Sequence, residues 1–278
     1  MKKTLLLLVS ITITVLAMSQ SKTSKDSTSA KKGMFGLFSK KSPAKPKETK
    51  SAYVKVKEPK KDWTKVDLSG RASDHFMIQY GADSWTNRPD SVRTGGFSRH
   101  FNMYFMLDKP FKTSPKFSVA YGVGIGSSNI FFNHVNVDVK SNSTRLPFTL
   151  ADSSNHYNKF KVTTIYAEVP VELRYFSNPA DPGKSWKAAL GVKVGTLLKS
   201  YSKGKDLQTK TGTSIYGPTY IFKESDKRFF NGTMLAITAR FGYGIVSLDA
   251  GYQINTVLKD GVGAPMNKFS LGLTFSGL

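Results

Sequence analysis

The residues of this chain whose types and spacing could do chemistry are charged side chains set at even intervals in residues 164–176. Glu168, Glu172 and Arg174 alternate there with apolar residues. Side chains two apart in a β-strand point to the same side, so the three would share one charged face opposite an apolar wall. Carboxylates beside a guanidinium form ion pairs or relay protons, depending on what covers that face.

A second candidate for chemistry is the pair His134 and Asp138, in the stretch Asn133-His-Val-Asn-Val-Asp138. The pair could ligate a metal or assist a hydrolase, but the sequence offers no third member, and solvated loop residues are the simpler interpretation. Gly-x-Ser-x-Gly, His-Glu-x-x-His and phosphate-cradling motifs are absent from the sequence. We therefore predict no catalytic residue, no metal and no cofactor, with a lipid-modifying outer-membrane enzyme as an alternative.

The elements that must position these charges are strands, because the same period-two pattern recurs along the chain. Apolar and polar positions alternate in residues 75–84, 97–107, 116–127, 161–176, 185–199, 229–241, 245–256 and 268–276. Their connections alternate between short (108–115, 178–184, 242–244) and long (85–96, 128–160, 200–227, 259–266). Short turns at one end and long loops at the other are typical of outer-membrane barrels, and an even strand number leaves both chain ends in the periplasm.

Two kinds of barrel fit this pattern, and they differ in the solvent on the apolar side. A soluble lipocalin-like carrier would turn its apolar faces inward. Against it, the polar faces are rich in glycine, which suits a narrow interior, and aromatic residues gather near the strand ends as interfacial girdles do. The glycines are Gly122, Gly124, Gly126, Gly191, Gly195, Gly251 and Gly272. We therefore predict an all-β fold, an eight-stranded antiparallel up-and-down transmembrane β-barrel with a disordered N-terminal tail.

In such a barrel the charged positions point into the lumen, which eight strands leave nearly filled by side chains. The inward charges are Glu168, Glu172, Arg174, Lys193, Arg240 and Asp249. Buried charges need partners, so we interpret the set as a structural network of ion pairs rather than a proton or ion path. Pro170 donates no hydrogen bond to a ladder, and we expect a local bulge there.

The N-terminal part of the chain predicts export. Lys2 and Lys3 precede an apolar run over residues 5–17, and we expect a signal peptide over residues 1–19, cleaved between Ser19 and Gln20. The chain has no cysteine, which excludes a lipoprotein anchor, disulfides and thiolate metal sites.

Residues 20–65 carry a large share of the net charge of +22, with fourteen lysines against four acidic residues. We expect a basic, disordered periplasmic tail there, followed by a barrel domain over residues 66–278. Anionic lipid headgroups or cell-wall polymers are plausible counterparts of the tail, and export argues against nucleic acid.

The strand Glu168-Val-Pro-Val-Glu-Leu-Arg-Tyr-Phe176 resembles one in the PorT-like or "outer membrane protein beta-barrel domain" proteins of Bacteroidetes. The stretches Tyr121-Gly-Val-Gly-Ile-Gly126, Ala189-Leu-Gly-Val-Lys193 and Ser270-Leu-Gly-Leu-Thr-Phe275 are similar to that family as well. The resemblance covers about residues 74–278 and implies an outer-membrane barrel. Two features depart from the family pattern: the basic tail, and the final Leu278 where many outer-membrane strands end in an aromatic residue.

From the barrel and this resemblance together we expect a binding or scaffolding role without catalysis. Outer-membrane lipids and outer-membrane or periplasmic proteins are the expected partners. A component of type IX protein secretion is the alternative function, since PorT itself is tied to that system.

Overall fold

The structure is a computed structural model that describes residues 75–90, 92–151 and 155–277. The expected signal peptide (1–19), its cleavage position and the basic tail (20–65) lie outside the described residues, as does the start of the predicted domain 66–278. In the described part of the chain, no helix is long and apolar enough to cross a membrane.

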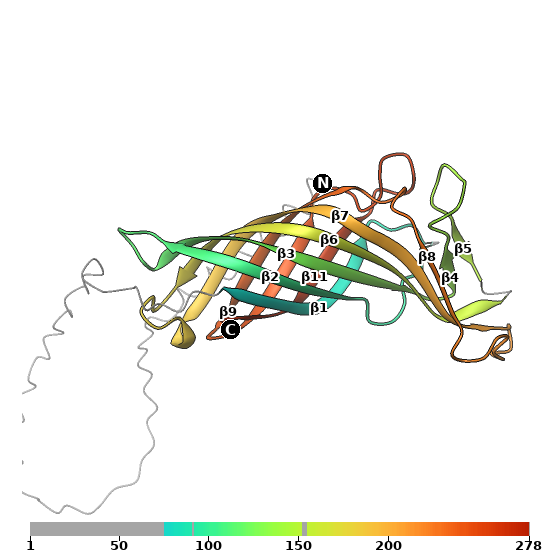
Figure 1. Cartoon of the computed structure of the whole chain (residues 1–278), viewed down its shortest axis with the longest axis horizontal. Coiled ribbons are helices and arrows are strands. Elements are labelled where there is room, and N and C mark those ends of the chain that lie inside the picture. The colour runs from blue at the N-terminus through green and yellow to red at the C-terminus, as the bar shows by residue number, and fades with distance from the viewer. Residues whose placement is uncertain (1–74, 91, 152–154, 278) are drawn as a thin grey trace, which may run out of the picture. The chain divides into compact units, whose positions relative to one another are not determined.

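The strands close into a barrel (Figure 1). In chain order they are β1 (Phe76–Thr86), β2 (Arg99–Pro110), β3 (Phe117–Phe132), β4 (Val135–Val137), β5 (Phe148–Leu150), β6 (His156–Phe176), β7 (Trp186–Gln208), β8 (Ile221–Ser225), β9 (Thr233–Tyr243), β10 (Val246–Gln253) and β11 (Asn267–Ser276). A short 3₁₀ turn, η2 (Pro182–Lys184), lies between β6 and β7. In the larger sheet the order is β6-β3-β2-β1-β11-β10-β9-β7-β8, and pairing of β6 with β7 closes the ring without β8. The predicted eight-stranded antiparallel barrel is confirmed.

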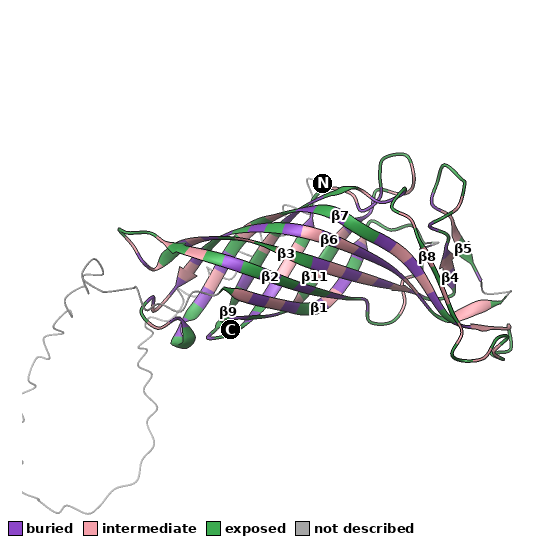
Figure 2. Cartoon of the chain, viewed as in Figure 1, coloured by how far each residue is buried: buried purple, intermediate pink, exposed green. Residues whose placement is uncertain are grey.

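Burial alternates along the strands (Figure 2). In the barrel wall the exposed positions are mostly large and apolar, and many buried positions are polar or charged. Leu190 is 68% exposed and Val123 is 61% exposed, whereas the inward Arg174 is 2% exposed. A wall of large apolar side chains is stable against hydrocarbon and not against water. The lumen is polar, the opposite of what a lipocalin-like carrier of apolar ligands requires.

Aromatic side chains form a girdle on the outer wall at the short-turn end of the barrel. Trp186 lies 5.5 Å from Phe241 and 5.4 Å from Tyr243, measured between ring centroids. Phe117 and Tyr175 pair at 5.3 Å on the neighbouring strands. Such girdles mark the boundary between hydrocarbon and water, because the rings are apolar with a polar edge. The girdle fixes where the membrane begins on this side.

At the long-loop end, strands continue into segments that we predicted to be loops. β6 has 21 residues and β7 has 23, and β8 pairs with β7 beyond the barrel. The prediction of loops over residues 128–160 and 200–227 is therefore wrong in part, because β3 reaches Phe132 and β4 and β5 form a hairpin. Past the membrane the outer face no longer needs to be apolar. In β6 the alternation is reversed there, with Phe160 and Val162 buried and Lys159 exposed, so the pattern that identifies membrane strands ends while the backbone pairing continues.

The expected bulge at Pro170 is also wrong. Pro170 lies opposite Lys193 of β7 without a shift, and the register with β3 is the same before and after it. Pairing with β3 stops at Tyr121–Val171 and resumes at Gly124–Glu168, so the missing N–H interrupts the ladder without bending it. The register between β6 and β7 shifts instead between Ile165 and Tyr166, where β7 has the extra residue Leu198.

A hydrophobic cluster, here called the cap, covers the lumen at the long-loop end. Strand ends and loops from the whole circumference contribute its buried side chains. They are Trp85, Val92, Ile130, Phe132, Val135, Val137, Val139, Leu146, Phe160, Val162, Tyr166, Leu197, Phe229, Phe230, Met234, Val257, Leu258 and Met266. Its water-excluding packing holds the long loops on the barrel.

Candidate functional site

The interior of the barrel holds the polar and charged side chains, and the first cluster is centred on Glu172. Its Oε2 accepts hydrogen bonds from Arg174 Nε at 2.9 Å and from Arg240 Nη2 at 2.7 Å. Asp108 Oδ1 lies 4.0 Å from Arg174 Nη1. These side chains are less than a tenth exposed, so the ion pairs are shielded from water and depend on one another.

The second cluster joins Glu168, Lys193 and Tyr104. Lys193 Nζ lies 3.1 Å from Glu168 Oε2 and donates to the Tyr104 hydroxyl at 3.0 Å. The same hydroxyl donates to Glu168. The carboxylate thus receives one cation and one neutral donor in the middle of the lumen.

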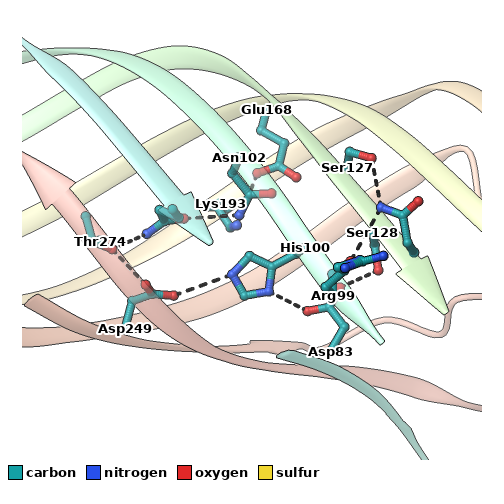
Figure 3. Close-up of polar contacts among 12 residues, drawn as sticks. Asp83, Arg99, His100, Asn102, Ser127, Ser128, Glu168, Lys193, Asp249 and Thr274 are labelled. Carbon is teal, nitrogen blue, oxygen red and sulfur yellow. Dashed lines mark hydrogen bonds and ion pairs between the residues drawn. The ribbon is translucent and has the colours of Figure 1, made fainter. Parts of the chain in front are cut away.

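The third cluster is built around His100 (Figure 3). Its Nδ1 lies 2.8 Å from Asp83 Oδ1, and its Nε2 faces Asp249 Oδ2 at 3.9 Å. Ser128 donates to Asp83, and Thr274 donates to Asp249 at 2.8 Å. Sequence reasoning missed His100 and Asp83 as network members, although both occupy polar-face positions in their strands.

All six residues predicted for the lumen network lie inside the barrel, but they do not form one network. Glu172, Arg174 and Arg240 form one group of ion pairs, and Glu168 and Lys193 form another. Asp249 belongs to neither of these groups, and its Oδ2 lies 3.9 Å from His100 Nε2.

Two cavities border these clusters in the described part of the chain, and both are small. A cavity of about 20 Å³ borders Gln79, His100 and Asn102, and another of about 10 Å³ borders Arg174 and Arg240. The larger has room for about one water molecule. The cap lies over the lumen on the long-loop side.

The candidate pair His134 and Asp138 makes separate contacts in the structure. The His134 ring stacks on His156 at 4.6 Å, while Asp138 Oδ1 accepts a hydrogen bond from the Lys140 amide. Within residues 75–90, 92–151 and 155–277, no group of three or more His, Cys, Asp or Glu side chains is arranged to hold a metal ion.

Outside the membrane, β6, β7 and β8 form a projecting sheet that carries the loop of residues 209–220. At its base, hydrogen bonds from Ser214, Asn158 and Gln208 hold the pKa of Asp206 below its usual range. Asp206 has a φ of 57°, a left-handed conformation that aspartate tolerates better than most residues. This geometry fixes the start of the loop. At the tip Tyr216 is 66% exposed and packs on Tyr220, with ring centroids 4.9 Å apart.

Replacing Gly126 with alanine is expected to lower the free energy of unfolding by about 1–3 kcal/mol through overpacking of the lumen. A Cβ atom there would lie 2.2 Å from Glu168 Oε1 and 2.9 Å from Asn102 Oδ1. Glu168 cannot move away without leaving Lys193. Urea unfolding in lipid vesicles measures the loss, with Gly232→Ala, which meets nothing within 4 Å, as the control. Equal stability of the two variants would contradict a close-packed lumen.

Comparison with known proteins adds the following. The model of a family described as "Outer membrane protein beta-barrel domain" matches residues 72–258, which include β1 through β10. Among solved structures, Ail, the attachment invasion locus protein of Yersinia pestis, matches with 15% identity and a TM-score of 0.29, covering 72% of this chain and 95% of that chain. Ail in complex with the heparin analogue sucrose octasulfate matches with 12% identity, a TM-score of 0.27 and the same coverage. No curated protein matches the chain.

Proposed function

Because this chain belongs to the family of outer membrane protein β-barrel domains, whose place is the outer membrane, we propose that it acts there by binding or scaffolding and not by catalysis. The observation that carries this proposal is the projecting sheet, in which β6 and β7 continue past the barrel and hold β8 and the loop of residues 209–220 away from it. Loops held on a rigid scaffold are where binding residues concentrate.

The barrel then serves as an anchor, and its outer end serves as the contact surface. We expect Tyr216 to contribute most to the binding energy, because an exposed tyrosine supplies a large contact area and loses little side-chain entropy on binding. We infer a protein partner outside the membrane for this tip.

Crosslinked affinity capture from cells tests this role. Tyr216→Ala is expected to lose the partners that the parent recovers, while Lys210→Ala, an exposed change in the same loop, keeps them. Identical recovery by all three proteins would contradict a binding role for the tip. Release of lysophospholipid by the purified barrel would contradict the absence of catalysis.

The interior clusters have a structural role in this proposal, which leads to a second expected result. Purified protein in planar lipid bilayers should produce no steady ion conductance, because ion-paired side chains and the cap fill the path. Single-channel recording checks this, with an open porin as the positive control. A stable, ion-selective current would favour transport over scaffolding.

Orientation follows from the strand order. β1 begins and β11 ends at the short-turn end, which is periplasmic in outer-membrane barrels. We propose that residues 20–65 therefore extend into the periplasm, where their excess of lysine would meet an anionic surface.

The finer assignment to the PorT-like proteins of Bacteroidetes is also a proposal, supported by the strand sequence from Glu168 to Phe176. A part in type IX secretion would follow from it. The same crosslinked capture would then recover secretion components, and their absence would leave a barrel of another role.

A further inference from the structure

The outer wall is apolar within the membrane and carries cations above it, where β6 and β7 leave the membrane and β8 pairs with β7. We call this group of cations the basic collar. Its side chains are exposed or half-buried and lie on the continuation of the apolar wall. They are Arg99, Lys159, Lys161, Lys199, Lys203, Lys205 and Lys223. The lumen, the cap and the loop tip are all separate from this surface.

The collar places like charges directly opposite one another across the sheet. Lys203 lies opposite Lys161 of β6 and opposite Lys223 of β8, and Lys159 lies opposite Lys205. In the part of the chain that the structure describes, no position paired with these lysines carries a carboxylate. Like charges at paired positions destabilise a sheet, so the arrangement is unfavourable unless an anion neutralises it.

Aromatic rings and one amide contact the cations of the collar, and Lys161 Nζ donates a hydrogen bond to Asn129 Oδ1 at 2.7 Å. Arg99 and Lys161 both lie over the ring of Phe131, at 5.3 Å and 5.8 Å from its centroid. Lys223 lies 4.5 Å from the centroid of Tyr201. Burial lowers the pKa of Lys161. Tyr201 opposes this shift, and the nearby charges of Lys203, Arg99 and Lys223 add to it.

The lower part of the collar lies within reach of the headgroup layer of the membrane. At a tilt of about 40° a strand advances about 2.5 Å along the membrane normal per residue, so an apolar band about 25 Å tall takes about ten residues. Counted along β6 from the girdle residue Tyr175, the band ends near Ile165. Lys161 then lies about 10 Å above the hydrocarbon, within reach of the headgroups for a long side chain.

We propose that the basic collar binds the phosphate groups of lipid headgroups in the outer leaflet. The side chains of the collar point away from the barrel axis, as those of the lipid-facing wall below them do. Lipids whose chains contact Val169 and Val171 therefore have their headgroups near the collar. A phosphate bound among several lysines attracts each of them and so offsets the repulsion between them. The contact would fix the depth and tilt of the barrel and the direction of the projecting sheet.

The test compares unfolding temperatures of the full-length protein in vesicles of phosphatidylcholine alone and in vesicles that also contain phosphatidylglycerol. The anionic lipid is expected to raise the midpoint of the parent by about 5 °C. Lys161→Gln, Lys203→Gln and Lys223→Gln together should abolish this gain and leave the variant at least as stable as the parent in phosphatidylcholine. The matched control, Lys140→Gln, Lys210→Gln and Lys259→Gln, removes the same charge from exposed positions elsewhere and should keep the gain.

Three outcomes would overturn the proposal. The collar variant could keep the full gain, or the control could lose it equally, which would mean a general charge effect. An equal gain from inorganic phosphate added to phosphatidylcholine vesicles would identify a soluble anion in place of a lipid headgroup. None of these results bears on the Tyr216 capture experiment, so the two proposals stand or fall separately.

Discussion

Replacing Glu172 with glutamine is expected to lower the free energy of unfolding by about 3–5 kcal/mol, the usual range for breaking a buried ion pair on one side. One carboxylate oxygen serves two guanidinium groups, Arg174 at 2.9 Å and Arg240 at 2.7 Å. A neutral amide of the same size would remove the anion that the two guanidinium groups share, although Asp108 stays beside Arg174. Urea unfolding in phosphatidylcholine vesicles, followed by tryptophan fluorescence, measures the change.

Two further variants separate charge from packing. Asp260→Asn makes the same chemical change at an exposed loop position and should alter stability by less than about 0.5 kcal/mol. Combining Glu172→Gln with Arg240→Gln removes one of the two cations that shared the carboxylate, so the double variant should recover part of the loss. If Glu172→Gln alone were as stable as the parent, the interior ion pairs would have no part in holding the barrel.

The sequence was sufficient for the barrel because the membrane imposes a rule on every strand that crosses it. Residues such as Val171 and Glu172 must point to opposite solvents, and that requirement appears directly as alternation. The same rule put Glu168, Glu172, Arg174, Lys193, Arg240 and Asp249 inside. Where the strands leave the membrane the rule no longer applies, and the upper parts of β6 and β7 could not be told from loops.

The pairing of the interior charges could not be predicted, because it depends on the strand register and on reach across the lumen. Arg240 and Asp249 are directly opposite on neighbouring strands, yet Arg240 extends to Glu172 instead. His100 meets Asp83 from the adjacent strand through a side-chain direction that no spacing rule gives. The period of the sequence predicts on which side of a strand a residue lies. Which charge it pairs with depends on distances across the lumen that the sequence does not contain.

Replacing Val171 with arginine is expected to lower the free energy of unfolding in a bilayer by about 2–4 kcal/mol, the cost of a cation near the midplane of a membrane barrel. Val171 is 41% exposed on the outer wall of β6, where Tyr121 and Val192 lie at the paired positions. It is four residues from the girdle residue Tyr175, close to the middle of the apolar band. The guanidinium would have to reach a headgroup layer more than a side chain away.

If the wall faces lipid, the loss of unfolding free energy caused by an arginine should depend on its depth in the membrane. A general intolerance of arginine would give the same loss at every depth. Leu150→Arg changes an exposed apolar residue of β5, outside the membrane, and should cost less than about 0.5 kcal/mol. Tyr175→Arg, at the girdle, should fall between the two, at about 0–1 kcal/mol. Equal costs at all three positions, measured by urea unfolding in vesicles, would mean that the apolar wall does not face hydrocarbon. A graded loss, greatest at Val171, follows only if the bilayer surrounds this wall, because water penalises a surface arginine equally little at every height.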